Sequence, residues 1–168
     1  MDWVDSFSQD VPVAAGGWAQ HISGAWSKRR TEALALLARD AELSRIVNLV
    51  GPEALSAAQR WELEGASLVK EAVLQQSALD DADSYCSPQK QFQLLELVMR
   101  VFDQGKELIE LGAPVQELAE QPVLARIRRA KSSWRSDESD QLAEFAAEVY
   151  RAFETMRSEY ASNQEVAS

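Results

Sequence analysis

Helical periodicity is the feature that most constrains how this sequence can fold. Apolar residues recur at intervals of three and four along most of the chain, and no segment shows the period-two alternation of a half-buried strand. The predicted fold is therefore all-α: a helical bundle with a helical hairpin, a central buried helix and a C-terminal helix. A chain of 168 residues can form one domain with a core of its own.

Two helices and the turn between them form the predicted hairpin. The first helix is expected over residues 28–50, and Gly51-Pro52 ends it, because glycine suits the position after a helix and proline cannot continue one. The second helix is expected over residues 56–76, since Ser56 and Gln59 have the spacing of a capping box. The apolar residues at helical spacing in the first helix are Leu36, Leu43, Ile46, Val47 and Val50.

The central and last helices also have recognisable boundaries. Ser87-Pro88 is a typical helix start, and the central helix should run from there to Leu111, with Gly112 as its cap. Its apolar residues cover a wide arc, which indicates burial on two sides. Two short helical pieces should follow, before a last helix that begins near Ser136. The predicted apolar face of that helix contains Leu142, Phe145, Ala146, Val149, Phe153, Met156 and Tyr160.

The two ends of the chain are expected to differ from the helical domain, which is assigned to residues 28–160. Residues 1–27 contain a proline and several glycines, so they are predicted to be irregular. They also contain three tryptophans, which favours a strap packed on the bundle over a disordered tail. Residues 161–168 are small and polar and are predicted to be a frayed tail.

Charge and composition exclude several classes of partner. The net charge of −10, from 17 basic and 27 acidic residues, argues against binding to nucleic acid or to anionic lipid. No run approaches the ~20 apolar residues of a membrane span, and no basic start followed by an apolar stretch indicates a signal peptide. The single cysteine, Cys86, excludes a disulfide framework and suggests a reducing, cytoplasmic setting.

The sequence predicts no catalytic residue and no metal site within this chain. Gly105-Lys106 lies in a predicted helix and lacks the rest of a phosphate-binding loop. His21 has no recognisable nucleophile, and a catalytic Cys86 would need a base that the sequence does not supply. The acidic cluster of Asp80, Asp81 and Asp83 is typical of a turn before a helix, although an all-α enzyme that binds Mg²⁺ there stays open.

Two longer stretches carry a resemblance to a known family. Residues 36–55 read LLARDAELSRIVNLVGPEAL, and residues 73–91 read VLQQSALDDADSYCSPQKQ. In this order they resemble the C-terminal helical domain of the catalytic A subunit (alpha chain) of V-type and archaeal-type rotary ATPases, whose version of the second stretch reads close to FLQQNAFDEVDTYCSPEKQ. The resemblance extends more loosely over residues 2–127, and the last helix fits the family only in pattern.

This resemblance implies a setting for the chain. The complete family protein has in addition a β-barrel and a nucleotide-binding domain with a phosphate loop, so the chain is expected to be a truncated C-terminal fragment. The parent couples ATP hydrolysis or synthesis to proton or sodium transport, and it works in a cytoplasmic head of alternating A and B subunits. ATP or ADP with Mg²⁺ would bind to the parent, and the fragment alone should neither bind a cofactor nor hydrolyse ATP.

Two sets of site residues follow from the resemblance. The tip of the hairpin, Gly51, Pro52, Glu53, Ala54, Leu55 and Ser56, resembles the segment that faces the central rotor stalk. The corresponding tip of the related F-type beta subunit is acidic, reading DELSEED, whereas this chain continues with Ala57, Ala58 and Gln59. Gln75, Gln76 and Leu79 resemble one wall of the adenine pocket, but the two aromatic positions of that motif hold Val73 and Leu79 here.

An alternative stays open beside this interpretation. A stand-alone helical protein-interaction module without nucleotide chemistry could share the same pattern of helices. In either case, surface that normally meets partner subunits could pair two copies, so a homodimer of the isolated chain is a further hypothesis.

Overall fold

The computed structural model of the chain describes residues 11–74, 88–130 and 139–166. All regular elements in these ranges are helical, which confirms the predicted all-α class. In chain order the elements are α2 (Val11–Val50), the 3₁₀ helix η1 (Pro52–Ala54), α3 (Ala57–Val69), the π-helical turn η2 (Lys70–Leu74), α4 (Pro88–Glu110), α5 (Val115–Ala119), α6 (Pro122–Arg128) and α8 (Ser139–Val166).

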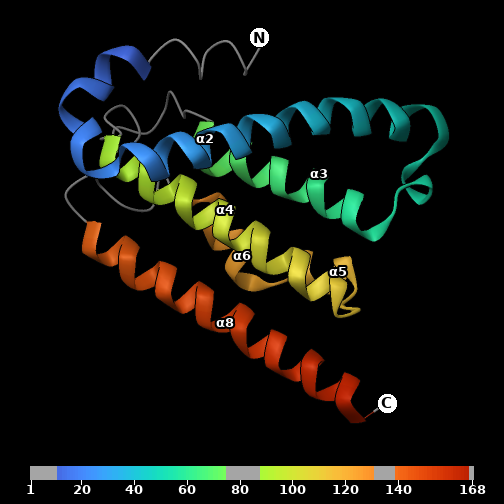
Figure 1. The fold of residues 1–168 in the computed structure, drawn as a ribbon. Coiled ribbons are helices and arrows are strands. Elements are labelled where there is room, and N and C mark those ends of the chain that lie inside the picture. Colours follow the sequence, from blue (N-terminus) through green and yellow to red (C-terminus); the bar gives the residue numbers. More distant parts are fainter. Residues whose placement is uncertain (1–10, 75–87, 131–138, 167–168) are drawn as a thin grey trace.

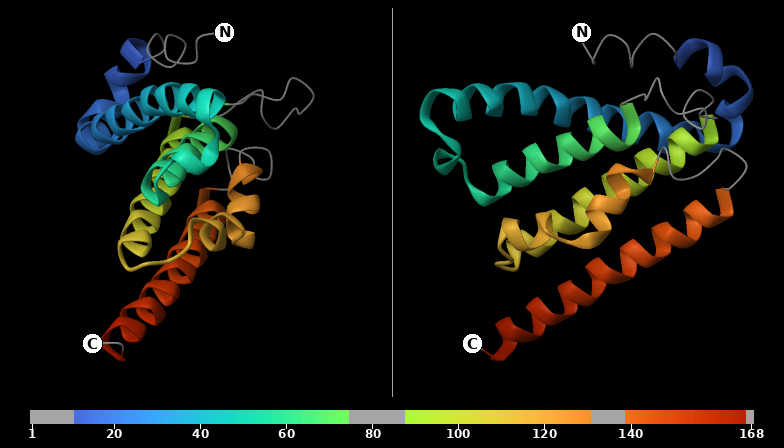
Figure 2. Two further views of the ribbon diagram at one scale, coloured as in Figure 1. Left: turned by 90° about the vertical axis from the view of Figure 1, so that its right-hand side faces the viewer. Right: turned by 180° about the vertical axis from the view of Figure 1, so that it is seen from behind.

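The helices form layers around α4. Figure 1 shows α2 and α3 as an antiparallel hairpin on one side of α4 and the long helix α8 on the other side. The short helices α5 and α6 pack against α3. The view from behind shows the same order, and in both views the closed end of the hairpin projects beyond the end of α4 (Figures 1 and 2).

The central helix α4 is buried on more than one face, as its wide apolar arc predicts. Its contacts with α2, α3 and α8 account for this burial. The helix begins at Pro88 and is followed by Gly112 at a φ of 90°, so both predicted boundaries are confirmed to within a residue. Its buried apolar side chains are Leu94, Leu95, Leu97, Val98, Met99, Val101, Phe102 and Leu108.

A reciprocal contact between two aromatic rings and two glycines joins α3 to α4. The indole of Trp61 lies on Gly105, and a Cβ at that glycine would fall 2.1 Å from the ring. Phe102 lies in the same way on Gly65, where a Cβ would be 2.5 Å from its ring. The Trp61 indole Nε1–H donates to the carbonyl oxygen of Phe102 at 2.9 Å. The two helices can approach this closely only because each has a glycine opposite the other's ring.

Charged side chains connect the hairpin to its neighbours. Arg29 on α2 donates to Glu96 at 2.9 Å and to Asp103 at 2.8 Å, both on α4. Burial lowers the pKa of Arg29, but the hydrogen bonds that it donates to these carboxylates and to Glu32 outweigh this effect and hold the pKa above its ordinary value. Arg29 therefore stays charged and fixes the start of the hairpin against the central helix.

The N-terminal segment differs from the sequence-based expectation. Residues 11–27 are helical and belong to α2, so the prediction that they are irregular is wrong. Pro12 lies in the first turn of the helix, where the missing N–H is not needed, and the first turns run at an angle to the rest of α2 (Figure 1). Trp26 packs on Phe92 of α4 with ring centroids 5.8 Å apart, so this part of the segment does lie on the bundle.

The C-terminal helix is longer than predicted, since α8 continues to Val166 and takes in most of the expected tail. Its predicted apolar face is confirmed at Leu142, Phe145, Val149, Phe153 and Met156, which are all buried. The division of the chain into a strap, a domain and a tail stays a prediction. Within the described ranges, no helix is both long and apolar enough to cross a membrane.

Candidate functional site

The closed end of the α2–α3 hairpin begins with a glycine that no residue with a side chain could replace without strain. Gly51 has a φ of 91°, a left-handed conformation that L-residues with a side chain avoid. Its N–H donates to the carbonyl of Val47 at 2.9 Å and completes the last turn of α2. A Cβ at Gly51 would also fall 2.8 Å from a carboxylate oxygen of Glu53. Pro52 then starts η1 and cannot extend the helix.

A capping box fixes the start of α3. The hydroxyl of Ser56 accepts from the backbone N–H of Gln59 at 3.2 Å, and the Gln59 side chain accepts from the N–H of Ser56 at 2.9 Å. Arg60 donates from its Nε to the carbonyl of Leu55 at 3.2 Å. The predicted capping box is therefore confirmed, and the turn between the helices has a defined conformation.

The six predicted tip residues divide into an anchor and an exposed loop. Leu55 is only 4% exposed and packs into the hairpin. Gly51 is half-buried, whereas Pro52, Glu53, Ala54 and Ser56 are exposed. The structure therefore brings the predicted contact residues together at the projecting end of the hairpin (Figure 1). Whether they contact a rotor stalk stays a prediction.

Next to this loop, the last turn of α2 exposes apolar side chains that the sequence analysis did not identify as functional. Leu49 is 84% exposed, Val50 66% and Ile46 38%, and they are the exposed large hydrophobic residues of the described chain. Ile46 and Val50 lie in a helix, as their spacing predicts, but the helix does not bury them. The first turn of α3 begins with the small residues Ala57 and Ala58.

The predicted adenine-pocket residues Gln75, Gln76 and Leu79 lie outside the described residues, so their role stays a prediction. The helix that leads to them ends in the π-helical turn η2, a form of helix that often occurs near functional sites. Val73, at one of the missing aromatic positions, is 4% exposed and belongs to the core.

Ion pairs hold η2 against two other helices. Lys70 pairs with Asp40 of α2 at 2.5 Å. Glu71 pairs with Arg128 of α6, which also pairs with Glu64 of α3. The segment that leads toward the predicted adenine wall is thereby fixed to both the hairpin and α6.

The other chemistry-bearing residues give no catalytic constellation in the described chain. Asp80, Asp81, Asp83 and Cys86 lie outside the described residues. Within the described ranges, no group of three or more histidine, cysteine, aspartate or glutamate side chains could hold a metal ion. Gly105 lies inside α4, toward its C-terminal end, and packs against an indole ring, as expected for a glycine that is not part of a phosphate loop.

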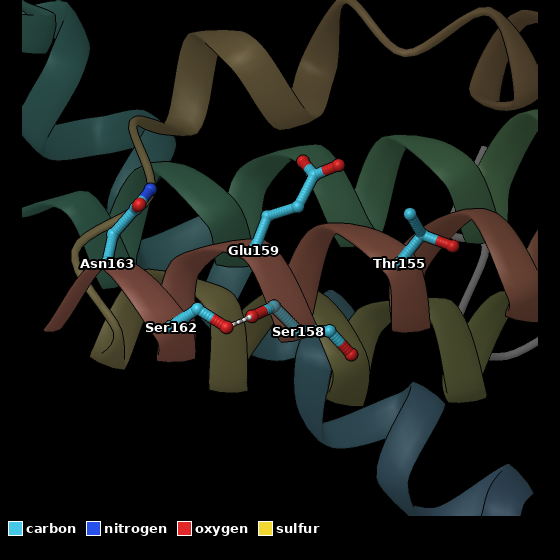
Figure 3. A pocket seen from close by; sticks show the side chains of 5 residues that line it. All are labelled: Thr155, Ser158, Glu159, Ser162 and Asn163. Atoms are coloured by element: carbon cyan, nitrogen blue, oxygen red, sulfur yellow. Dashed lines mark hydrogen bonds between the residues drawn. The ribbon is translucent and has the colours of Figure 1, made fainter. Parts of the chain in front are cut away.

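Two shallow surface hollows lie near the C-terminus. Figure 3 shows one on the outer face of α8, where the hydroxyl of Ser162 donates to the backbone carbonyl of Ser158 at 2.8 Å. A second hollow lies between the end of α4 and α8. The side chains that line the first are Thr155, Ser158, Glu159, Ser162 and Asn163. All five come from one helix, so they do not enclose a ligand.

Comparison with known proteins assigns this fold to a family. The family model of the C-terminal domain of V and A type ATP synthase matches residues 15–118, a range that includes most of α2 and all of α3 and α4. The V-type ATP synthase alpha chain of Nitrosococcus oceani is 55% identical over 161 residues, covering 96% of this chain and 27% of that protein.

More distant relatives agree with this assignment. The A-type ATP synthase A subunit of Ignicoccus hospitalis is 36% identical over 149 residues, covering 88% of this chain and 25% of that protein. The corresponding A-type ATP synthase protein of Pyrococcus horikoshii is 37% identical over 131 residues, covering 78% of this chain and 14% of that protein. The chain thus spans about a quarter or less of the length of these relatives. The chain belongs to the family of C-terminal domains of V- and A-type ATP synthases.

Proposed function

We propose that this chain acts as the C-terminal helical domain of the catalytic A subunit of a rotary ATPase and that its role is mechanical. In this role the hairpin moves with the nucleotide-binding domain and pushes the central stalk with its closed end. The observation that carries the proposal is the projecting hairpin, whose turn is fixed by Gly51 and by the capping box of Ser56 and Gln59. A turn of defined shape can transmit displacement, because it does not absorb the motion itself.

The contacts along the hairpin support this role. Leu43 of α2 is fully buried, and Arg39 pairs with Glu62 across the two helices at 3.4 Å. Further along, Trp61 joins α3 to the central helix through its contact with Gly105. The hairpin therefore has side-chain support from near its closed end to the body of the domain, as an element that transmits force requires.

The chemistry of the proposed machine lies mostly outside this chain. ATP or ADP with Mg²⁺ would bind to the nucleotide-binding domain of the complete protein, and Gln75, Gln76 and Leu79 would form one wall of the adenine pocket. B subunits and the central stalk are the proposed partners, in the cytoplasmic head of a complex that transports protons or sodium ions. The chain by itself would not hydrolyse ATP.

The alternatives receive less support. A stand-alone interaction module is not favoured, because the family model and the relatives all point to an ATP synthase domain. An enzyme that uses Mg²⁺ at Asp80, Asp81 and Asp83 has no support from the described residues. The homodimer of the isolated chain stays a hypothesis, and a monomer in sedimentation at high concentration would contradict it.

A cross-linking experiment tests the proposal. A complete catalytic subunit carrying this domain, with Cys86→Ser and Glu53→Cys, is assembled with B subunits and with a central stalk that carries single cysteines. Oxidation should join the tip to the stalk and stop ATP hydrolysis until the disulfide is reduced. The matched control is Glu144→Cys, at an exposed position on α8, which should give no cross-link. Failure of Glu53→Cys to cross-link with any stalk position would refute the proposal.

A further inference from the structure

From the exposed apolar residues at the end of α2, we infer that the tip meets the central stalk through an apolar contact. The contact surface, called the end patch below, consists of Ile46, Leu49 and Val50. Its partner is an apolar surface on the stalk rather than a charged one. This inference rests on the proposed function, and it names the chemistry of the contact and the residues that make it.

The geometry of the end patch suits such a contact. The spacing of Ile46, Leu49 and Val50 by three and four residues places them on one face of the last turn of α2. Exposure of apolar groups to water is unfavourable, so an exposed cluster of this kind typically marks a binding surface. Because Gly51 and the capping box fix the adjoining turn, the end patch is presented in one orientation.

The charges near the hairpin end favour an apolar partner over an ionic one. The first turn of α3 reads Ala57-Ala58-Gln59-Arg60 and has no acidic side chain; its one charged group, the Arg60 guanidinium, donates back to the carbonyl of Leu55 within the turn. Glu53 is the acidic residue in η1, and the end patch itself is uncharged. The apolar side chains are therefore the main source of contact energy available at this end of the hairpin.

The size of the end patch favours the stalk over a second copy of the chain. Three aliphatic side chains on one helical turn can bury on the order of 100 Å² each. A stable interface needs roughly 800 Å² from each partner. The end patch is therefore too small to hold two copies together. A contact with the stalk must break and re-form as the stalk turns, and a small contact area suits that.

The test measures the affinity of the purified central stalk for the assembled ring of A and B subunits. The double variant Leu49→Ser with Val50→Ser should weaken binding about tenfold. The matched control is Asn48→Ser, at an exposed position of the same turn, and it should change the affinity less than twofold. Because all three positions are exposed, thermal unfolding should show both variants folded as stably as the parent.

Salt and self-association separate the apolar contact from its alternatives. The affinity lost in the double variant should be the same at low and high salt, since ionic contacts between exposed groups are screened and apolar ones are not. A loss confined to low salt would overturn the inference, and so would unchanged affinity in the double variant. A homodimer of the chain that the double variant dissociates would assign the end patch to a second copy and would also overturn it.

The cross-link of Glu53→Cys distinguishes failure of this inference from failure of the proposed function. If the cross-link to the stalk forms but the double variant binds normally, the tip meets the stalk through other residues and only this inference fails. If the cross-link is absent at every stalk position, the proposed function fails and the inference fails with it.

Discussion

Gly105→Ala should destabilise the domain, because it separates the hairpin from the central helix. The added methyl group would fall 2.1 Å from the indole of Trp61, which is fully buried and hydrogen-bonded to Phe102. Overpacking of this kind costs about 1–3 kcal/mol, and loss of the indole hydrogen bond would add about 1 kcal/mol. The better helix propensity of alanine returns about 1 kcal/mol. We therefore expect a net loss of about 1–3 kcal/mol in the free energy of unfolding.

The assay is urea unfolding followed by circular dichroism and tryptophan fluorescence. In thermal unfolding of a chain of this size, each kcal/mol of lost stability should lower Tm by about 2–4 °C. Gly24→Ala is the matched control, since it is the same substitution in a helix with no atom within 4 Å of the new Cβ. It should stabilise the chain by about 0.5–1 kcal/mol. If Gly105→Ala were as stable as the parent while Gly24→Ala raised stability as expected, the close contact with Trp61 would not exist.

Three further predictions concern the cap, the core and the half-buried Tyr150. Ser56→Ala removes half of the capping box and should cost about 1 kcal/mol in chemical unfolding, whereas a change below ~0.3 kcal/mol would mean that the cap is dispensable. Phe153→Ala should lower the free energy of unfolding by about 3–5 kcal/mol, because this side chain on α8 is only 1% exposed. A loss below ~1 kcal/mol in the same assay would show that α8 does not pack on the bundle at this position. Burial raises the pKa of Tyr150, an effect that nearby Arg100 partly offsets; stability from neutral Tyr150 should therefore be present below about pH 10 and decline as pH rises through the higher folded pKa. Tyr150→Phe should reduce this alkaline decline and remove one tyrosinate absorbance step that lies above the ordinary range, and an unaltered titration would contradict the assignment.

Local sequence signals predicted the parts of the fold that depend on one or two residues. Gly51 and Gly112 both take a positive φ, as the ends of their helices require. Ser56 forms its capping box and Pro88 begins α4, because these effects act within one helical turn. The two-sided burial of α4 also followed from the sequence, since a helix with a wide apolar arc must bury more than one face.

Features that depend on residues distant in the sequence could not be predicted from local sequence signals. The spacing of Ile46 and Val50 is the same whether a neighbouring helix covers them or not, and here both are exposed. The contact between Trp61 and Gly105 joins residues on different helices, so neither residue alone indicates it. The helical state of residues 11–27 was missed because glycines lower helix propensity by only about 1 kcal/mol each, which the rest of the helix and its packing can outweigh.

The candidate site was only partly accessible from sequence. The resemblance to rotary ATPases indicated the turn from Gly51 to Ser56, and the structure places it at the projecting end of the hairpin. The end patch beside it was not identified, because exposure is a property of the packed hairpin. Its one signal was Leu49, which widens the apolar arc at the end of α2 beyond what a single neighbouring helix can cover.

Torque on the central stalk provides the most direct test of a mechanical role. Deletion of Pro52–Ala54, the η1 segment, shortens the closed end while the nucleotide-binding part of the complete catalytic protein stays unchanged. In single-molecule rotation of the assembled head, we expect ATP hydrolysis to continue while the torque on the stalk falls. Undiminished torque from the shortened hairpin would contradict the claim that this domain pushes the stalk.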